Sequence, residues 1–547
     1  MKLTGMARLG VAAAAGLAAI GAGLVPAVAQ AAAPGGRAAP AVTYHAGTPG
    51  VARLVPRDAR AATSGPVRVI PKGTRRLRSG TFSAAEAVPG ARAAGAASTG
   101  ATLANFNGVS SRDSQVTNYN LLFEPPDQGL CQGHGYVLEA VNSAYRFYNT
   151  NGKSLRGPFN INDLFNVGGK EFTSDPRCWF DPSSQTWFAT ILFINDTSTA
   201  SDLLIAVRHA RDPLGLWNEY QINTTDIANG CPCFGDQPRI GIDQDNLYVT
   251  DDEFSILGPQ FLGAEVWAFD KAELVAGATR LHFVRFPYLR VGGQLTVAPQ
   301  PALSAGTPNA EYFLSSLDFA GRGDHRIAVW AMTRRGQVGT GGMPVLSSTV
   351  IRAEAYANPP PAPQKGSASK LDSGDDRMQQ VAFTGGTVWG ELTTAVRPAG
   401  DSVVRAGGAW FQVRPKLGGT GIAGASIVRQ GYLDAAGRYL IYPAVQPDAA
   451  GNAAVVFTLT GSTRFPSAAF ATLAAGRRSF GAPVVAARGT GPYSPKATRW
   501  GDYSFAVPDG TSDSAWLATE YIPPKPSQTT NGFRNWGTRV FEVPLGR

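Results

Sequence analysis

The chain contains 547 residues, with 49 Lys and Arg against 40 Asp and Glu, and its formal net charge is +9. Most of this excess lies in residues 30–100, where Asp58 and Glu86 are the only acidic residues. Residues 101–547 are therefore nearly neutral, and their charge gives no support for a nucleic-acid-binding surface.

The first 29 residues are typical of a signal peptide for export. Lys2 and Arg8 flank the start of an apolar stretch over residues 9–25, and Ala27-Val28-Ala29 offers small residues for cleavage. A membrane anchor is the less favoured interpretation, because the stretch is short and rich in Ala and Gly. We therefore expect a secreted protein whose mature part has no membrane span.

Residues 30–104 are rich in Ala, Gly, Pro and Arg and contain few large apolar side chains. Such a composition buries too little surface to offset the entropy lost on ordering, so a disordered linker is expected.

From residue 105 onward, short hydrophobic segments recur at intervals of 51 to 77 residues. A period of this size in a strand-rich chain predicts an all-β fold, a seven-bladed β-propeller of four-stranded antiparallel blades over residues 105–547. Seven aromatic or apolar anchor residues open these segments: Tyr136, Trp187, Tyr248, Tyr312, Trp389, Val455 and Trp516.

The second repeat shows the expected blade most clearly. Hydrophobic segments at 177–181, 186–194, 203–210 and 217–222 are separated by Pro, Gly, Asp and Ser, as an antiparallel meander requires. Helical periodicity is weak throughout, and residues 270–274 are expected to form one short turn.

Four cysteines lie in the first three repeats: Cys131, Cys178, Cys231 and Cys233. An even number in an exported chain indicates two disulfides, for which three connectivities exist. Cys131–Cys178 is favoured, because both residues lie near the anchors of adjacent repeats. Cys231 and Cys233 then pair with each other. A zinc site is disfavoured, because no histidine is suitably spaced.

Three segments resemble a known group of proteins: residues 124–152, 175–189 and 499–522. They are similar to exported bacterial β-propeller proteins of the sialidase/BNR-like repeat type, most of which have no assigned activity. The resemblance covers residues 118–547 and implies the fold, but it implies little chemistry. Cys131 departs from the usual first repeat and adds support for a disulfide.

Carboxylates precede five of the anchors by 9 to 14 residues, and arginines often lie beside them. These positions begin the innermost strands of a propeller, so they are expected to surround one mouth of the central channel. They form either a polar ligand-binding site or a set of contacts between blades. The candidate ligand-binding residues, which include one histidine, are Asp127, His134, Asp175, Arg177, Asp236, Arg239, Asp376, Arg377 and Asp502.

A sialidase-type site is an alternative. Arg177, Arg239 and Arg377 would converge on a substrate carboxylate, and Tyr503 or Tyr521 would act as a nucleophile with Glu520 as its base. The repeat motif of such enzymes is only approximated at residues 180–187. Second-strand carboxylates are alternative acid and base candidates for a glycoside hydrolase: Glu139, Asp251, Asp252, Glu253 and Glu391.

No cofactor and no metal site are expected. Ca²⁺ at residues 243–246 or 195–202 is an alternative, although neither segment has EF-hand spacing. The favoured function is a secreted, monomeric binding module for an extracellular glycan, peptide or protein partner. The alternative is a glycoside hydrolase acting on extracellular carbohydrate. A binding module should pair its arginines with aspartates, whereas a hydrolase should leave them converging on an open pocket.

Overall fold

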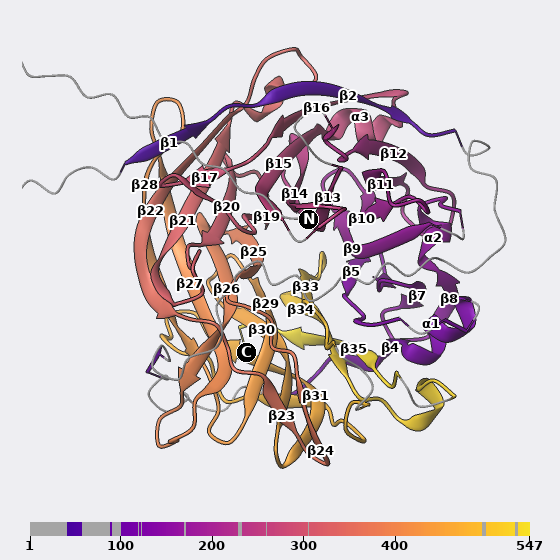
Figure 1. Ribbon diagram of the computed structural model, residues 1–547, viewed down its shortest axis with the longest axis vertical. Helices are drawn as coiled ribbons and strands as arrows, with labels where there is room; N and C mark the ends of the chain where they lie inside the picture. The colour runs from indigo at the N-terminus through magenta and orange to yellow at the C-terminus, as the bar shows by residue number, and fades with distance from the viewer. Residues whose placement is uncertain are drawn as a thin grey trace, which may run out of the picture. The chain divides into compact units, whose positions relative to one another are not determined.

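β-Strands make up most of the described chain, and helices are few and short (Figure 1). The computed structural model describes residues 41–56, 88–89, 100–118, 120–121, 123–168, 171–227, 232–258, 260–304, 306–494, 499–530 and 534–546. The expected signal peptide and most of the expected linker therefore lie outside the described residues. Within them, no helix is long and apolar enough to cross a membrane.

The first four groups of strands follow one another along the chain, and each is a four-stranded antiparallel meander. The strands are β5 (Gly129–Gly133), β6 (Tyr136–Ala140), β7 (Ala144–Asn149) and β8 (Ser154–Asn160); β9 (Phe172–Asp181), β10 (Thr186–Ile194), β11 (Ser201–His209) and β12 (Asn218–Asn223); β13 (Cys233–Ile242), β14 (Asn246–Ser255), β15 (Phe261–Asp270) and β16 (Arg280–Phe286); β19 (Gln300–Ser304), β20 (Glu311–Ser316), β21 (Asp324–Thr333) and β22 (Val345–Tyr356).

Three further groups complete the described strand order, and the last takes its fourth strand from before β5. The strands are β25 (Met378–Thr384), β26 (Thr387–Arg397), β27 (Arg405–Leu417) and β28 (Ile422–Leu433); β29 (Tyr439–Pro447), β30 (Ala453–Gly461), β31 (Arg464–Leu473) and β32 (Val484–Ala487); β33 (Phe505–Pro508), β34 (Ser514–Tyr521), β35 (Gly537–Pro544) and β4 (Ala104–Ser110).

Each anchor residue lies in the second strand of its group. Six of the seven are buried, and Tyr136 is half-buried. Strands such as β10, where every residue is buried, read as continuous hydrophobic runs because both faces of the sheet are covered. The repeat in the sequence therefore records the burial of one equivalent strand in each group.

The first strands of successive groups contact one another in chain order. The contacts run from β5 to β9, β13, β19, β25, β29 and β33, and β33 in turn contacts β5. Short parallel pairings join β13 to β19 and β19 to β25. Figure 1 shows these strands around the middle of the view, with the fourth strands farther out.

Residues 42–54 correct the expectation of a disordered linker over residues 30–104. They form β1 (Val42–His45), which pairs with β22, and β2 (Thr48–Leu54), which pairs with both β16 and β12. The outer strands offer unpaired main-chain groups, so a segment with little apolar surface gains order through hydrogen bonds to edges that are already folded. The amino-acid composition of the segment gives no indication of these hydrogen bonds. Farther along, β3 (Val88–Pro89) pairs with β26.

Gly50 allows β2 to lie close against β16. A Cβ at this position would lie 2.3 Å from the Phe283 ring. We expect Gly50→Ala to destabilise the pairing by about 1–3 kcal/mol, the usual cost of overpacking. Amide hydrogen exchange of residues 48–53 should accelerate. Gly419→Ala is the control, because nothing lies within 4 Å of its added Cβ. Unchanged protection in Gly50→Ala would contradict the packing argument.

Smaller elements lie in the connections between strands. α3 (Lys271–Ala276) confirms the short turn expected near residue 270 and is capped by Asp270. α1 (Ser111–Thr117) was not expected, although Ser110 and Asp113 form a capping box at its start. The remaining elements are α2 (Ile161–Leu164), the 3-10 turns η4 (Arg335–Gln337) and η5 (Lys525–Ser527), and the strand pairs β17 (Arg290–Val291) with β18 (Gln294–Leu295) and β23 (Ala362–Gln364) with β24 (Ser367–Leu371).

The Cys131–Cys178 disulfide is confirmed. It joins β5 to β9 with a Cα–Cα distance of 5.3 Å, and both residues are buried. The bond therefore links the first strands of two successive groups. The second expected bond includes Cys231, which lies outside the described residues, and it stays a prediction.

Candidate ligand-binding site at the starts of the first strands

Most candidate residues lie just before a first strand or inside it. Asp127 precedes β5, Asp175 and Arg177 lie in β9, and Asp236 and Arg239 lie in β13. Asp376 and Arg377 directly precede β25, and Asp502 precedes β33. The first strands contact one another in turn. The candidate side chains that lie in or just before these strands are therefore brought close together.

β-Bulges shape the starts of several first strands. In β9, β13 and β29, two residues oppose one on the second strand, and the first of the two has a positive φ angle. A positive φ is uncommon outside glycine, and bulges redirect side chains beside functional sites. The bulge pairs are Asp175-Pro176, Gln237-Pro238 and Tyr442-Pro443.

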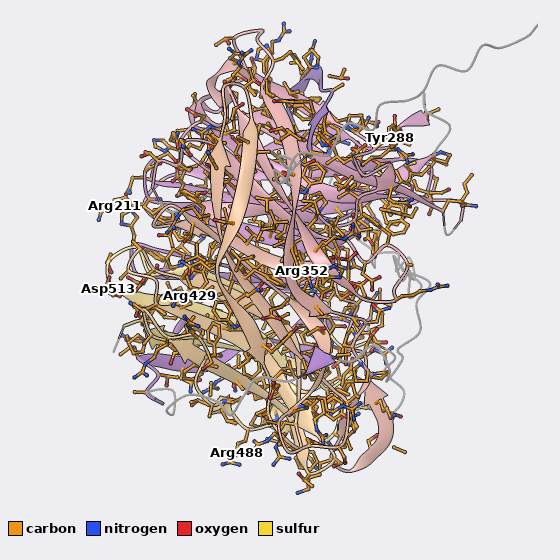
Figure 2. The ribbon with its side chains drawn as sticks, turned by 90° about the vertical axis from the view of Figure 1, so that its left-hand side faces the viewer. Arg211, Tyr288, Arg352, Arg429, Arg488 and Asp513 are labelled. Atoms are coloured by element: carbon orange, nitrogen blue, oxygen red, sulfur yellow. A yellow bond between two sulfur atoms is a disulfide. The ribbon has the colours of Figure 1, made fainter. Side chains whose placement is uncertain are left out.

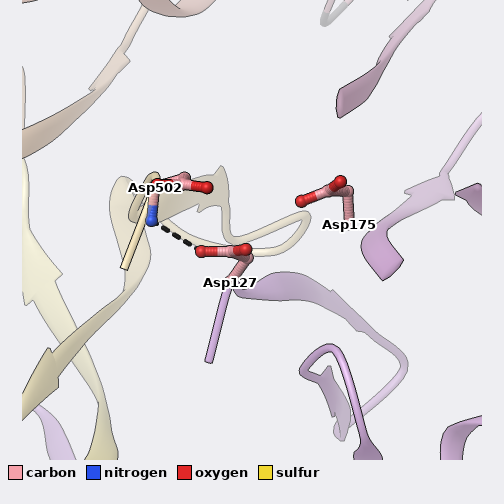
Figure 3. Close-up of side chains that lie close together, drawn as sticks. All are labelled: Asp127, Asp175 and Asp502. Atoms are coloured by element: carbon pink, nitrogen blue, oxygen red, sulfur yellow. Dashed lines mark hydrogen bonds between the residues drawn. The ribbon is translucent and has the colours of Figure 1, made fainter. Parts of the chain in front are cut away.

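Three aspartates come together among these residues (Figure 3). One carboxylate oxygen from each of Asp127, Asp175 and Asp502 lies within 4.8 Å of the other two. Asn142 connects the first two, since its Nδ2 donates to Asp127 Oδ2 at 2.7 Å and its Oδ1 accepts from the Asp175 N–H at 2.7 Å. The Asp502 N–H donates to Asp127 Oδ1 at 2.6 Å. Burial, followed by the charges of Asp502 and Asp175, raises the pKa of Asp127 well above its usual range.

The three candidate arginines also gather around one bulge. Arg239 and Arg377 both donate to Gln237 Oε1, at 3.1 and 2.8 Å, and Arg177 Nε donates to the Pro238 carbonyl at 3.4 Å. The first two are ion-paired as well: Arg239 with Asp252 at 2.6 Å and Arg377 with Asp375 at 2.7 Å. The guanidinium groups therefore converge, but on a side-chain amide and a main-chain carbonyl of the protein itself.

Arg177 differs from the other two arginines. Its guanidinium carbon lies 3.3 Å from the centre of the Tyr503 ring, so the contact is a cation–π interaction. Burial lowers the pKa of Arg177.

The Tyr–Glu pair of the sialidase-type alternative is not formed. Tyr503 Oη donates to the Pro176 carbonyl at 3.5 Å, and Tyr521 Oη donates to Asn107 Oδ1. Glu520 Oε2 instead accepts from the Gly501 N–H at 2.7 Å. Tyr521 and Glu520 are adjacent in β34, so their side chains point to opposite faces of the sheet.

The remaining candidates take separate positions. Asp376 is buried and Asp236 is half-buried near the arginines. His134 lies in the turn between β5 and β6, at the opposite end of β5 from Asp127. Its Nε2 contacts Gln185 Oε1 in the turn that follows β9. His134 is thus apart from the aspartates and arginines.

Tyr442 lies in the bulge of β29 and was not singled out in the sequence. It is 3% exposed, and its hydroxyl has no hydrogen-bond partner among the described residues. Burial, with the charges of Asp372 and Asp502, raises the pKa of Tyr442 well above its usual range. Proline inside a strand is a signal for a bulge, so Tyr442-Pro443 within a hydrophobic run was the available clue.

A second acidic cluster surrounds Arg285. Arg285 Nη2 lies 3.0 Å from Asp226 Oδ2, 3.7 Å from Glu253 Oε1, and in contact with Glu265 Oε1. Burial raises the pKa of Glu265 to about 7. Among the carboxylates expected in second strands, Asp251 and Glu253 lie in this cluster or beside it, and Asp252 pairs with Arg239.

Glu139 ties the first group of strands to β4. Its Oε2 accepts from the Val109 N–H at 2.7 Å, and burial raises its pKa from 4.5 to about 7. The folded state therefore binds a proton more tightly than the unfolded state, so stability should fall as the pH rises from about 4.5 to about 7 and then level off. The loss should be on the order of 3 kcal/mol.

Glu139→Gln should abolish this part of the pH dependence, because it mimics the protonated carboxyl and keeps an acceptor for Val109. Urea unfolding at pH 5 and pH 8 measures the effect, and the variant should be more stable than the wild type at pH 8. Asp513→Asn, at an exposed position (Figure 2), should keep the wild-type pH dependence. Parallel curves for Glu139→Gln and wild type would refute the assignment.

The two segments considered for Ca²⁺ have structural roles. In residues 243–246, Asp243 Oδ1 accepts main-chain N–H groups of its own turn, and Oδ2 contacts Arg335. In residues 195–202, Asn195 Oδ1 accepts the N–H groups of Thr199 and Ala200.

A cavity of about 830 Å³ lies away from these residues, along the first two groups of strands. Tyr145, Phe147 and Trp217 contribute aromatic rings to its lining, and Arg156 and Asp163 contribute charges.

No protein-family model and no curated protein matches the sequence. Among solved structures, a putative exo-beta-1,3-galactanase from Bifidobacterium bifidum is 11% identical with a TM-score of 0.29, over 59% of this chain and 96% of that one. An alpha-L-arabinofuranosidase of Fusarium graminearum with arabinobiose is 11% identical with a TM-score of 0.29, over 80% and 97%. The parainfluenza virus 5 hemagglutinin-neuraminidase ectodomain is 8% identical with a TM-score of 0.34, over 68% and 80%. At these values the likenesses carry no argument about function.

Proposed function

We propose that residues 105–547 form a closed seven-bladed β-propeller that is exported and, as a monomer, binds an extracellular glycan at the starts of its first strands. The order of contacts from β5 through β33 and back to β5 supports the ring. The pairing of β4 with β35 supports its closure, because strands from both ends of the domain then share one blade. The expected signal peptide and the disulfide favour export.

The observation that carries the binding proposal is a set of charged groups held in fixed pairs at this end of the strands. The side chains of Arg377, Arg499 and Asp502 are 14%, 16% and 16% exposed. Arg499 pairs with Asp502, and the charge of Asp502 also acts on Arg377. In each pair, the N–H donors of an arginine lie beside the acceptor oxygens of an aspartate, and the two charges cancel. Such a pair suits the hydroxyl groups of a sugar, which both donate and accept hydrogen bonds.

Pairing also argues against recognition of a substrate carboxylate by the arginines. Arg239 and Arg377 already bind Asp252 and Asp375. A carboxylate ligand would have to displace these partners, whereas a neutral sugar can use the remaining N–H groups. A neutral glycan is therefore the favoured ligand over an acidic one.

A glycan array probed with the purified chain tests the proposal, followed by calorimetry with any glycan that binds. Arg377→Met and Asp502→Asn should each lower the affinity at least tenfold, as expected for a lost charge-assisted hydrogen bond of about 1.5–3 kcal/mol. Asp513→Asn should have no effect. Unchanged affinity in both site variants would reject this site.

A glycoside hydrolase is the second candidate, and one observation favours it. Glu520 accepts from the Gly501 N–H, next to Asp502 in the chain, and the charge of Asp502 acts on Glu520, so these two carboxyl groups are close enough to interact. Burial raises the pKa of Glu520 well above its usual range, which suits a general acid, and the ion-paired Asp502 suits a base.

Chromogenic glycosides distinguish the two candidates. Turnover that is abolished in Glu520→Gln and retained in Asp513→Asn would establish the hydrolase. Binding without turnover of any glycoside would leave the binding module.

A further inference from the structure

The cavity along the first two groups of strands is built from several separate elements. Tyr145 and Phe147 lie in β7, Arg156 and Phe159 lie in β8, and Trp217 directly precedes β12. The cavity volume of about 830 Å³ falls within the usual range for small-molecule sites, about 300–1,000 Å³. None of these residues belongs to the candidate site at the starts of the first strands, so the cavity is a separate place for a ligand.

Aromatic rings form much of the apolar part of the lining. The centre of the Tyr145 ring lies 5.4 Å from that of Phe159 and 5.6 Å from that of Phe147, with interplanar angles of 44° and 90°. Trp217 Nε1 donates to the Pro213 carbonyl at 3.0 Å, and the Trp217 side chain is buried. Packing and this hydrogen bond therefore hold the rings in place before any ligand binds, as is usual for a preformed site.

Polar groups with unused hydrogen-bonding capacity lie beside these rings. Tyr145 is 7% exposed, and its hydroxyl has no hydrogen-bond partner among the described residues. Burial, followed by the charge of Asp163, raises the pKa of Tyr145, so the Asp163 carboxylate lies near this hydroxyl. Arg156 Nη1 donates to the Leu214 carbonyl at 3.0 Å, and within the described chain its other N–H groups have no acceptor. The cavity thus offers a hydroxyl, a carboxylate and a guanidinium next to apolar rings.

The end of β2 and the two residues that follow it form another part of the lining. Leu54, Val55 and Pro56 line the cavity, and the Val55 N–H donates to the Glu219 carbonyl at 2.8 Å. Leu54 also pairs with Tyr220 in β12. A ligand in the cavity would therefore contact a segment that is ordered by its pairing with β12.

The charges of the lining favour an uncharged ligand. Arg156 is basic, whereas Asp163 and Glu219 are acidic. An anion would meet the two carboxylates, and a cation would meet the guanidinium. Hydroxyl groups avoid both conflicts, because they donate to a carboxylate and accept from an arginine.

We propose that this cavity binds a neutral saccharide, with its C–H groups against the aromatic rings and its hydroxyl groups on Tyr145, Arg156 and Asp163. A sugar ring matches the lining because it combines apolar C–H groups with hydroxyl groups that both donate and accept hydrogen bonds. The inference goes beyond the proposed function, because it adds a second site that lies along third and fourth strands and not along the first strands. One chain could then hold two sugar units at once.

Calorimetry of the full chain with a panel of neutral disaccharides tests the proposal: maltose, cellobiose, lactose and N,N′-diacetylchitobiose at millimolar concentration. We expect binding of at least one member of the panel. Amide hydrogen exchange locates the bound disaccharide, which should slow exchange in residues 145–147, 156–159 and 214–220 and at residues 54–55. Absence of binding by every member, or protection confined to the starts of the first strands, would overturn the proposal.

Two conservative variants test the polar contacts of the cavity. Tyr145→Phe removes only a hydroxyl and Asp163→Asn removes only a charge, and circular dichroism checks that both variants fold. Each should lower the affinity for the disaccharide about three- to tenfold, the value of one lost hydrogen bond. Asp513→Asn, at an exposed position, is the control and should bind as the wild type does.

The same measurements separate this site from the one at the starts of the first strands. Unchanged affinity in both Tyr145→Phe and Asp163→Asn would reject the cavity. A loss seen only in Arg377→Met would place the disaccharide at the starts of the first strands instead. The two proposed sites can therefore fail independently.

Discussion

Replacing Arg239 by Met is expected to lower the free energy of unfolding by about 3–5 kcal/mol, the usual cost of removing one partner of a buried ion pair. Arg239 and Asp252 have side chains that are each 1% exposed, and their N–O distance is 2.6 Å. Without the guanidinium, the buried Asp252 carboxylate keeps a hydrogen bond from the Ala298 N–H and the charge of Arg377, but it has lost its ion-pair partner. Urea unfolding at pH 7 measures the loss.

Two comparisons make this prediction specific. Arg239→Met combined with Asp252→Asn should recover most of the stability, because neither member of the pair then carries a charge and Asn keeps an acceptor for Ala298. Arg326→Met removes an exposed arginine from a pair with Asp324 at a similar distance of 2.7 Å and should cost less than about 1 kcal/mol. Equal losses in Arg239→Met and Arg326→Met would show that burial does not set the cost.

Removing the Cys131–Cys178 disulfide is expected to destabilise the protein by about 4 kcal/mol, the chain-entropy value for a loop of this length. The cross-linked residues are separated by 47 positions and join the first strands β5 and β9. The double variant Cys131→Ala/Cys178→Ala, unfolded in urea, measures the loss. The cross-link acts mainly on the unfolded chain, so the folded strand pairing should persist.

The packing of the two cysteines needs a separate control, because both are buried. The single variants Cys131→Ala and Cys178→Ala each remove the cross-link but only one side chain. If both singles lose nearly as much stability as the double, the cross-link dominates. A loss confined to the double variant would assign the effect to packing.

Much of the strand pattern could be predicted from the sequence. The hydrophobic segments of the second repeat coincide with β9 to β12, and every anchor lies in a second strand. Alternation and turn residues are local signals, and repetition along the chain lets weak signals reinforce one another. The strands at residues 42–54 were not predicted, because they are ordered by pairing with the edges of strands that are distant in the sequence.

The candidate residues were chosen from the sequence, but the contacts between their side chains were not predicted. The sequence placed Asp127, Asp175 and Arg239 at strand starts. In the structure Asp127 precedes β5, whereas Asp175 lies in the bulge inside β9 and Arg239 directly follows the bulge inside β13. It did not reveal that Asp252 pairs with Arg239, or that the buried Tyr442 lies in a bulge of β29. Both depend on bulges, where one added residue redirects the following side chains, and on the register between separate strands.

The sequence by itself determined the repeat and the second-strand anchors, and it favoured the Cys131–Cys178 bond among three connectivities. These follow from patterns within about one repeat length, where hydrophobic alternation and turn residues act locally. Only the tertiary structure decided which arginine meets which carboxylate, that three aspartates share one place, and that residues 42–54 bind the outer strands. These depend on distances between groups of strands, and short-range patterns along the chain do not encode them.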